Sequence, residues 1–329
     1  MLRRLQSSRL EACLNLGTVF LTPQPRGRKL GPTGGIMDTA TAAPNENITY
    51  TPIKPLVGST VEGIDLAAPL SEEAFAELRR QMCDRGVLIL KNQDMTPAEQ
   101  IAFSKRFGEL EHHVLQDLCL PGHPEIFVVS NIIEDGKKIG AYDGSRIYHI
   151  DCAYLEKPSM GSVFYCLEHP EEGGQTVAIN LAAVYEALDD DMKKFLEGRT
   201  VVRDYVWHYE RNHADRTPLT PEQRAKTPPI EHPAVVSHPE TGKNILFIDA
   251  MYCRRFGDMS EEDSRPIFKE LMDFADQDQF KVVHTWTVGD VMIWDNRGSV
   301  HKRLPFDLEG TRRRMHRTTV MGERPAFNG

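Results

Sequence analysis

Apolar residues recur every three or four positions in several segments, and this spacing predicts amphipathic helices. The first such segment lies between Ser71 and Gly86, which suit the N-cap and the residue beyond the C-terminus of a helix. Thr96-Pro97-Ala98-Glu99 combines the capping-box pattern with proline at the first helical position, so a second helix is expected from there to Phe107. Two further helices are expected at residues 181–195 and 261–274.

Short apolar runs between these segments predict strands. Val87-Leu88-Ile89-Leu90 has no polar residue, which is typical of a strand buried on both faces. The other expected strands are residues 126–130, 146–151, 161–167, 175–179, 200–206, 234–237, 245–248, 282–287, 290–294 and 314–321. Many short strands with few helices between them predict a mainly β fold with flanking helices, an antiparallel sandwich or jelly roll. The polar, proline-rich segment 218–229 is expected to be a surface excursion or a lid.

The N-terminal segment differs in composition from the rest of the chain. Residues 1–36 hold six basic side chains against the single acid Glu11, together with prolines and glycines that would break a helix. Two interpretations remain, a mitochondrial transit peptide and a non-native upstream extension with Met37 as the working start. We expect residues 1–50 to be a disordered or non-native extension and residues 51–329 to form one domain.

Composition and charge argue against several classes of protein. The 329 residues are 40% hydrophobic and 26% charged, which is ordinary globular usage. A formal net charge of -9 argues against a nucleic-acid partner, and no stretch has the roughly 18–20 apolar residues of a transmembrane helix. The six cysteines form no C-x-x-C pair, which favours reduced thiols in a cytoplasmic protein over a zinc ribbon or a disulfide framework. Whether the chain forms a homo-oligomer stays open.

The first chemical signal is the pair His149 and Asp151. On a strand these two side chains project from the same face, so both could bind one metal ion. His301, which ends the segment 294–301, could arrive from a distant strand as a third ligand, presented by a hydrogen-bonded turn at 295–297. Two imidazoles and one carboxylate on one side of a metal are diagnostic of non-haem Fe(II) oxygenases. The alternative is a strand histidine and an acid that make ordinary hydrogen bonds.

The second signal is the arginine-rich segment 310–317. On a strand, Arg313, Met315 and Arg317 share one face. Two guanidinium groups on an inward face are costly unless each meets an anion, and a carboxylate in bidentate geometry is the natural partner. The sequence therefore predicts binding sites for anions close to the metal site.

Together these motifs resemble the TauD/TfdA family, the Fe(II)- and 2-oxoglutarate-dependent dioxygenases that include taurine and 2,4-D dioxygenases. The motifs that carry the resemblance are H-x-D at 149–151, W-D-N-R…H at 294–301, R-x-M-x-R at 313–317, F-G-E-L at 107–110, G-G-Q-T at 173–176 and Asn131. They occur in the family's order between about residues 53 and 325. The resemblance implies a double-stranded β-helix, a jelly roll of the cupin type, and a requirement for Fe(II), 2-oxoglutarate and O2.

The resemblance also implies roles for individual residues. The residues that match the family's iron ligands are His149, Asp151 and His301. Arg313, helped by the hydroxyl of Thr176, would bind the distal carboxylate of 2-oxoglutarate. The spacing from His301 to Arg313 is about one residue longer than in taurine dioxygenase, which leaves Arg312 as the alternative.

The resemblance leaves the substrate open. Arg317 and His113 fall where taurine dioxygenase holds its anionic substrate group, but Ser145 and Tyr148 replace an asparagine and a tryptophan of that enzyme. The segment 130–137 is more similar to the 2,4-D branch. Candidates to line an aromatic pocket are Tyr142, Tyr252 and Trp207. We expect hydroxylation of a small organic anion, an aryloxyalkanoate or a sulfonate, with release of succinate and CO2. The alternatives are a zinc-dependent hydrolase and a non-catalytic β-barrel that binds small molecules.

Overall fold

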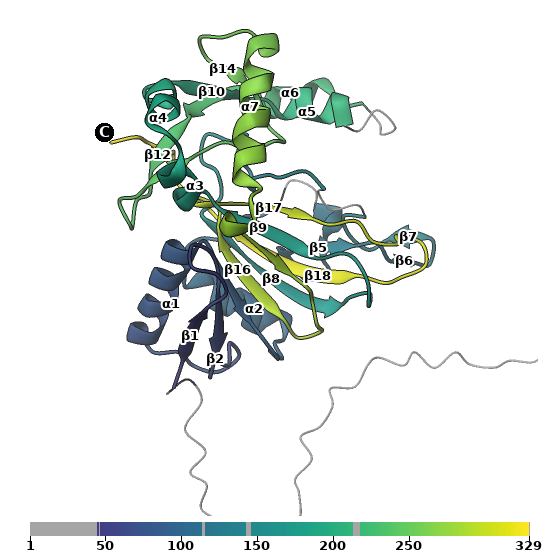
Figure 1. Ribbon diagram of the computed structural model, residues 1–329. Helices are drawn as coiled ribbons and strands as arrows, with labels where there is room; N and C mark the ends of the chain where they lie inside the picture. The colour runs from purple at the N-terminus through teal and green to yellow at the C-terminus, as the bar shows by residue number, and fades with distance from the viewer. Residues whose placement is uncertain (1–44, 46, 114–115, 143–145, 213–217, 329) are drawn as a thin grey trace, which may run out of the picture. The chain divides into compact units, whose positions relative to one another are not determined.

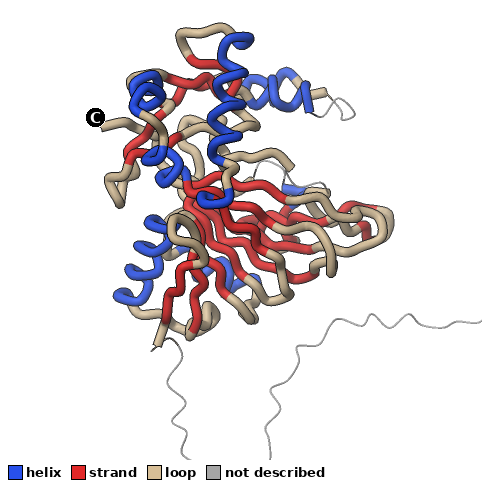
Figure 2. The backbone as a smooth tube through the Cα atoms, in the orientation of Figure 1, coloured by secondary structure: helices blue, strands red, loops and turns tan. Residues whose placement is uncertain are grey.

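Two β-sheets face each other and enclose the residues discussed below. The computed structural model describes residue 45 and residues 47–113, 116–142, 146–212 and 218–328. The larger sheet has the strand order β1-β2-β3-β16-β8-β18-β5-β4, and the smaller one has the order β15-β9-β17 (Figure 1). Neighbouring strands are antiparallel, apart from the parallel pair β2 and β3. The predicted mainly β fold with flanking helices is confirmed (Figure 2).

The bounds of the elements are as follows. The larger sheet contains β1 (Thr49–Pro52), β2 (Ser59–Glu62), β3 (Val87–Leu90), β16 (Val291–Asp295), β8 (Gly161–Glu168), β18 (Arg314–Val320), β5 (His123–Ser130) and β4 (Cys119–Leu120). The smaller sheet contains β15 (Lys281–His284), β9 (Thr176–Asn180) and β17 (Ser299–Arg303). The α-helices are α1 (Glu72–Arg85), α2 (Pro97–Lys105), α3 (Leu181–Ala187), α4 (Asp190–Leu196), α5 (Tyr205–Asn212), α6 (Pro221–Lys226) and α7 (Glu261–Ala275). The remaining strands are β6 (Ile133–Glu134), β7 (Lys137–Lys138), β10 (Thr200–Arg203), β11 (Ile230–Pro233), β12 (Val235–Ser237), β13 (Asn244–Leu246) and β14 (Cys253–Phe256).

The central strands of the larger sheet are buried on both faces because a different core lies on each side. On β16, Ile293 packs with the apolar stripes of α1 and α2, whereas Met292 and Trp294 pack with residues of the smaller sheet such as Ala178 and Val282. This two-sided burial accounts for the continuous apolar runs in the sequence. A third core lies between the outer face of the smaller sheet and the helices α3, α4 and α7.

The predicted ends of α1 and the predicted start of α2 agree with the structure, whereas α2 ends at Lys105 and not at Phe107. Ser71 caps α1 by accepting a hydrogen bond from the backbone of Ala74, and Gly86 ends it with a φ of 76°. Thr96 and Glu99 form both hydrogen bonds of the capping box at the start of α2. Capping residues can be recognised in the sequence because the unpaired backbone groups at a helix end are satisfied by residues close by in the chain. The 181–195 segment is two helices, since the chain turns extended at Leu188 and Asp189 caps α4.

One predicted strand is absent and another is shorter than predicted. Residues 146–151 do not form a strand; within the described residues only His149 makes a β-bridge, to His301, and a turn begins at Asp151. The strand predicted at 200–206 ends at Arg203, because α5 starts at Tyr205. The segment 218–229 contains the short helix α6. At residues 146–151 tertiary contacts override the local β propensity.

The described structure includes residues before position 51. The side chain of Asn45 donates hydrogen bonds to the carbonyl oxygens of Asp65 and Pro69, and β1 starts at Thr49. The predicted boundary at 50/51 therefore cuts through β1. The leader proposed at residues 1–36 lies outside the described residues. No helix in the described ranges is long and apolar enough to cross a bilayer.

Candidate active site

His149, Asp151 and His301 converge on one point between the two sheets. His149 and His301 exchange two backbone hydrogen bonds of 3.0 Å, which places their rings side by side with centroids 4.2 Å apart. The Nε2 atom of His149 lies 3.6 Å from Oδ1 of Asp151, and that of His301 lies 3.9 Å from Oδ2. One ligand atom from each residue lies within 4.8 Å of the other two. The turn after Ile150 brings the carboxylate into place, rather than the strand alternation we expected.

The carboxylate of Asp151 is held by the segment that precedes His301. Its Oδ2 accepts hydrogen bonds from Ser162 Oγ at 3.0 Å and from the indole of Trp294 at 3.3 Å. The amide oxygen of Asn296 accepts the backbone N–H of Asp151 at 3.3 Å. The indole of Trp294 also packs against His301, with ring centroids 4.4 Å apart. The W-D-N motif at 294–296 thus holds the side chains of Asp151 and His301 in position. Residues around the ligands of a metal site commonly have this supporting role.

The charge state of this trio suits a divalent cation. Burial alone would raise the pKa of Asp151, but the guanidinium of Arg317 and the two imidazoles outweigh it and hold the pKa well below its usual range. Burial and the neighbouring His149 lower the pKa of His301 to about 3, so this imidazole is neutral at pH 7. The carbonyl oxygen of Ile147 accepts a hydrogen bond from Nδ1 of His149 at 3.0 Å, which leaves the lone pair on Nε2. One carboxylate and two imidazole nitrogens are therefore available as donors to a cation.

Arg313 is buried between the sheets, and no carboxylate of the described residues is paired with it. Its backbone N–H donates to Asn131 Oδ1 at 2.8 Å, and Asn131 also donates to the carbonyl oxygens of Leu308 and Thr311. The guanidinium carbon lies 5.7 Å from the ring centroid of Phe164, and Nε has no hydrogen-bond partner among the described residues. Burial is the main cause that lowers the pKa of Arg313, to about 9. A buried cation in this condition calls for an anion.

Arg312 faces away from this interior. Its Nε lies 2.8 Å from the carboxylate of Glu168, and more than half of its side chain is exposed. Of the two arginines left open by the sequence, only Arg313 therefore points inward.

Thr176 is the first residue of β9 in the smaller sheet. It is buried, and its Oγ1 accepts a hydrogen bond from the indole of Trp286 at 3.0 Å. The G-G-Q-T turn before it brings the backbone close to Arg313, because a Cβ added to Gly174 would lie 3.5 Å from Cδ of that arginine. Gly174 also has a φ of 68°, which favours glycine.

Arg317 contacts Asp151 directly, which the sequence did not indicate. Its Nη1 donates to Asp151 Oδ1 at 2.7 Å. Its guanidinium carbon lies 5.2 Å from the centroid of Phe127, and the ring of His113 packs against Phe127 at 4.3 Å. Phe127 thus connects the two residues predicted to bind the substrate. In this structure the charge of Arg317 is neutralised by Asp151.

Sequence reasoning missed the residues that surround Arg317. Both carboxylate oxygens of Glu111 lie 3.6 Å from the thiol of Cys152. Burial raises the pKa of Glu111, and Arg317 opposes that rise. The ring of Tyr154 makes an edge-to-face contact with that of Tyr252, with centroids 5.0 Å apart, so one of the three predicted aromatic candidates lies in this group. The only available signal was adjacency, since Glu111 follows the F-G-E-L motif and Cys152 follows H-x-D.

The other two aromatic candidates have their own contacts. The indole of Trp207 donates to Glu261 at 3.0 Å, and the ring of Tyr142 lies 4.4 Å from Nζ of Lys138.

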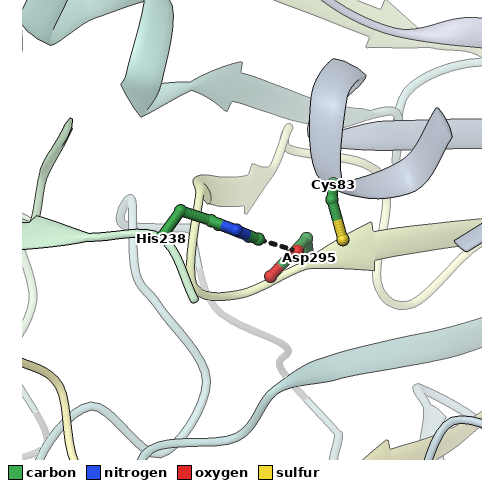
Figure 3. A group of neighbouring side chains, drawn as sticks. All are labelled: Cys83, His238 and Asp295. Atoms are coloured by element: carbon green, nitrogen blue, oxygen red, sulfur yellow. Dashed lines mark hydrogen bonds and ion pairs between the residues drawn. The ribbon is translucent and has the colours of Figure 1, made fainter. Parts of the chain in front are cut away.

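A second convergent group consists of Cys83, His238 and Asp295, and Figure 3 shows the imidazole of His238 directed at the carboxylate of Asp295. Nδ1 of His238 accepts two backbone N–H groups, so the proton is on Nε2, which donates to Asp295 at 2.9 Å. Arg297 also donates to this carboxylate at 2.8 and 2.9 Å. The oxygens of Asp295 already accept hydrogen bonds from the guanidinium of Arg297 and the imidazole of His238. We therefore interpret this group as a structural one that stabilises the turn before His301.

The chain matches the family model described as "Taurine catabolism dioxygenase TauD, TfdA family" over residues 49–319. The 2,4-dichlorophenoxyacetate dioxygenase of Cupriavidus pinatubonensis, which is alpha-ketoglutarate-dependent, is 28% identical over 290 residues; the match covers 84% of this chain and 99% of that protein. A taurine dioxygenase structure from Burkholderia xenovorans superposes with a TM-score of 0.72 at 26% identity, covering 85% of this chain and 91% of that one. The structure of AAD-2 in complex with Mn(II) and N-oxalylglycine has a TM-score of 0.73 at 26% identity, covering 85% and 99%.

The family match spans both sheets and every element that contributes to the converging trio. The chain belongs to the TauD/TfdA family of 2-oxoglutarate-dependent dioxygenases.

Proposed function

We propose that the protein binds Fe(II) through His149, Asp151 and His301 and oxidises a small organic anion with O2 and 2-oxoglutarate. The observation that carries this proposal is the convergence of a charged carboxylate and imidazole nitrogens within 4.8 Å. This donor set fits Fe(II), and two imidazoles with one carboxylate are the residue types of the facial triad of non-haem oxygenases. The two facing sheets are consistent with a double-stranded β-helix, which we propose as the fold.

The buried guanidinium of Arg313 fits the second part of the proposal. 2-Oxoglutarate carries a distal carboxylate, and a carboxylate can accept two parallel hydrogen bonds from a guanidinium. The orphaned Nε of Arg313 and the hydroxyl of Thr176 supply donors on the wall where that carboxylate would lie. When bound, iron and 2-oxoglutarate supply an O2-dependent oxidation that leaves succinate and CO2. The side chains of this protein orient both groups and exclude water from them.

Arg317 is proposed as the anchor for the anionic group of the substrate. In the metal-free site its charge is neutralised by Asp151. A divalent cation bound to Asp151 would take over that carboxylate, which frees the guanidinium for another anion. The aromatic rings of Tyr154 and Tyr252 nearby suit an aryl group. We therefore propose an aryloxyalkanoate or a sulfonate as substrate, the classes named for the relatives that act on 2,4-dichlorophenoxyacetate and taurine.

A spectroscopic experiment separates this function from its two alternatives. Under anaerobic conditions, Fe(II) and 2-oxoglutarate together are expected to give a weak visible charge-transfer band. A zinc-dependent hydrolase or a non-catalytic binding protein would give none. A succinate-release screen across phenoxyacids, sulfonates and sulfate esters then identifies the substrate class. Absence of both the band and succinate release would refute the proposal.

The substitution Arg317→Ala is expected to raise the KM for an anionic substrate by about 10-fold or more, because one charge-assisted hydrogen bond is worth roughly 1.5–3 kcal/mol. The KM for 2-oxoglutarate should change much less. Steady-state succinate release with each compound varied in turn measures both constants. Equal effects on the two would assign Arg317 to the metal site through Asp151 instead.

A further inference from the structure

The indole of Trp286 donates a hydrogen bond to the hydroxyl of Thr176, which is proposed above as a donor to 2-oxoglutarate. The two atoms lie 3.0 Å apart, and neither side chain is more than 5% exposed. Thr176 begins the middle strand of the smaller sheet, where it pairs with His284 on β15 and with Arg303 on β17. It shares a face of β9 with Ala178, which belongs to the core between the two sheets. The hydrogen bond therefore reaches a hydroxyl on the inner face of the smaller sheet.

Two neighbouring rings hold the indole of Trp286 in its orientation. It makes edge-to-face contacts with Phe164, with centroids 5.5 Å apart, and with His284, with centroids 4.6 Å apart. The ring of His284 is held in turn, because its Nε2 lies 3.0 Å from the buried carboxylate of Asp290. A buried indole N–H requires an acceptor, and in this packing the acceptor is Oγ1 of Thr176.

The indole restricts what the hydroxyl of Thr176 can do. A hydroxyl has one proton and two lone pairs, whereas an indole N–H is a donor only. The indole therefore occupies one lone pair of Oγ1, and the hydroxyl proton cannot point toward Trp286. Without such a partner, a threonine hydroxyl is free to turn its proton to a nearby backbone carbonyl. With Trp286 in place, the hydroxyl is restricted before a ligand arrives, and such preorganisation lowers the cost of binding.

Thr176 and Arg313 are close enough to act on one carboxylate. Gly174 lies against this arginine, since an added Cβ would be 3.5 Å from both Cδ and Nε of Arg313. Thr176 follows two residues later, a span of at most about 7 Å in extended backbone. A carboxylate has two oxygens that accept hydrogen bonds in several directions, so one such group can accept from both side chains.

We propose that Trp286 is a positioning residue for 2-oxoglutarate, which acts through Thr176 and directs that hydroxyl as a donor to the distal carboxylate. The effect of Trp286 on the ligand is carried by the hydroxyl of Thr176. The inference rests on the proposed function, because it requires that 2-oxoglutarate binds in this interior.

Binding measurements on the Mn(II)-loaded protein test this role without turnover. Calorimetric Kd values are compared for 2-oxoglutarate and for 2-oxobutyrate, which lacks the distal carboxylate. Trp286→Phe is expected to raise the Kd for 2-oxoglutarate by about 5-fold, which corresponds to about 1 kcal/mol, the contribution of one neutral hydrogen bond. The Kd for 2-oxobutyrate should stay within about 2-fold, because this compound has no carboxylate for the hydroxyl to meet.

A double-mutant cycle separates positioning from packing. Thr176→Val keeps the shape of the side chain without the hydroxyl, so it should raise the Kd for 2-oxoglutarate by about 10-fold. In the Thr176→Val background, Trp286→Phe should have no further effect, because no hydroxyl is left to direct. A further rise in the double variant overturns the inference, since Trp286 would then act through packing. So does an unchanged Kd for 2-oxoglutarate in Trp286→Phe, or an equal rise for both compounds.

Tyr165→Phe is the matched control, because it also removes a polar group from a buried aromatic side chain. Tyr165 lies in the core on the other face of β8, where its hydroxyl donates to the carbonyl oxygen of Gln93 at 3.1 Å. This variant should bind both compounds as the wild type does. Should Trp286→Phe fail to fold, 3-benzothienylalanine at position 286 keeps the shape of the indole while sulfur replaces the N–H. The same changes in Kd are then expected.

The outcome also separates this inference from the proposed function. If Thr176→Val weakens 2-oxoglutarate binding and Trp286→Phe does not, only the role of Trp286 is lost. If Thr176→Val leaves the Kd unchanged, the inference fails while Arg313 keeps its proposed role. If the wild type fails to bind 2-oxoglutarate with Mn(II), both the proposed function and the inference fail.

Discussion

Asp151→Asn is expected to abolish succinate formation, with a loss larger than the roughly 100-fold that removal of an outer-shell partner of a metal costs. The substitution keeps the shape of the side chain but removes the only carboxylate of the trio. A neutral amide is a poor ligand for Fe(II), so the stabilisation of the protein by added Mn(II) should vanish as well. Thermal unfolding with and without Mn(II), and succinate release, measure the two effects.

The same substitution should also destabilise the metal-free protein. Arg317 is buried and its ion pair with Asp151 is 2.7 Å long. Removing one partner of a buried pair leaves the other charge uncompensated, which costs about 3 kcal/mol. The loss of activity alone therefore does not identify a metal ligand, because part of it could follow from a weaker fold.

Asp249→Asn supplies the control for this ambiguity. Asp249 forms an ion pair with Arg203 in which both side chains are fully buried, and Arg203 lies on β10, outside the two facing sheets. This variant should lose a similar free energy of unfolding while it keeps the Mn(II)-induced rise in Tm and measurable succinate release. Retention of the Mn(II) effect in Asp151→Asn would remove Asp151 from the ligand set.

Arg313→Leu is expected to raise the Kd for 2-oxoglutarate by about 100-fold, since it removes the charge-assisted hydrogen bonds to the distal carboxylate. The free energy of unfolding of the ligand-free protein should not fall. In that state the guanidinium is a buried cation whose Nε has no hydrogen-bond partner in the described part of the chain, and replacing such a charge by an apolar side chain is expected to be neutral or stabilising. Calorimetry with Mn(II) and urea unfolding measure the two quantities.

A raised Kd for 2-oxoglutarate without a loss of stability distinguishes a ligand-binding arginine from a structural one. Arg312→Leu is the matched control, because Arg312 is adjacent in sequence but exposed and paired with Glu168. It should leave both the Kd and the stability nearly unchanged, as expected for a surface ion pair. A large drop in stability for Arg313→Leu, with an unchanged Kd, would contradict the proposed role.

The sequence alone determined what depends on neighbours along the chain. The caps at Ser71, Gly86 and Thr96 are local, because a helix end is satisfied by side chains within a turn. The apolar run at 87–90 identified a strand buried on both faces, since no polar residue interrupts it. The residue types of the trio also indicated metal chemistry before any distance was known.

Only the tertiary structure decided how the functional side chains meet. Asp151 reaches the two imidazoles through a turn in which Cys152 has a φ of 57°, and no local pattern predicted that turn. The sequence left Arg312 as an alternative to Arg313, because the spacing from His301 is about one residue longer than in taurine dioxygenase. The structure buries Arg313 and exposes Arg312. The pairing of Arg317 with Asp151 and the position of Arg303 opposite Thr176 depend on strand register. Register is set by contacts between distant segments, so it is absent from any single stretch of residues.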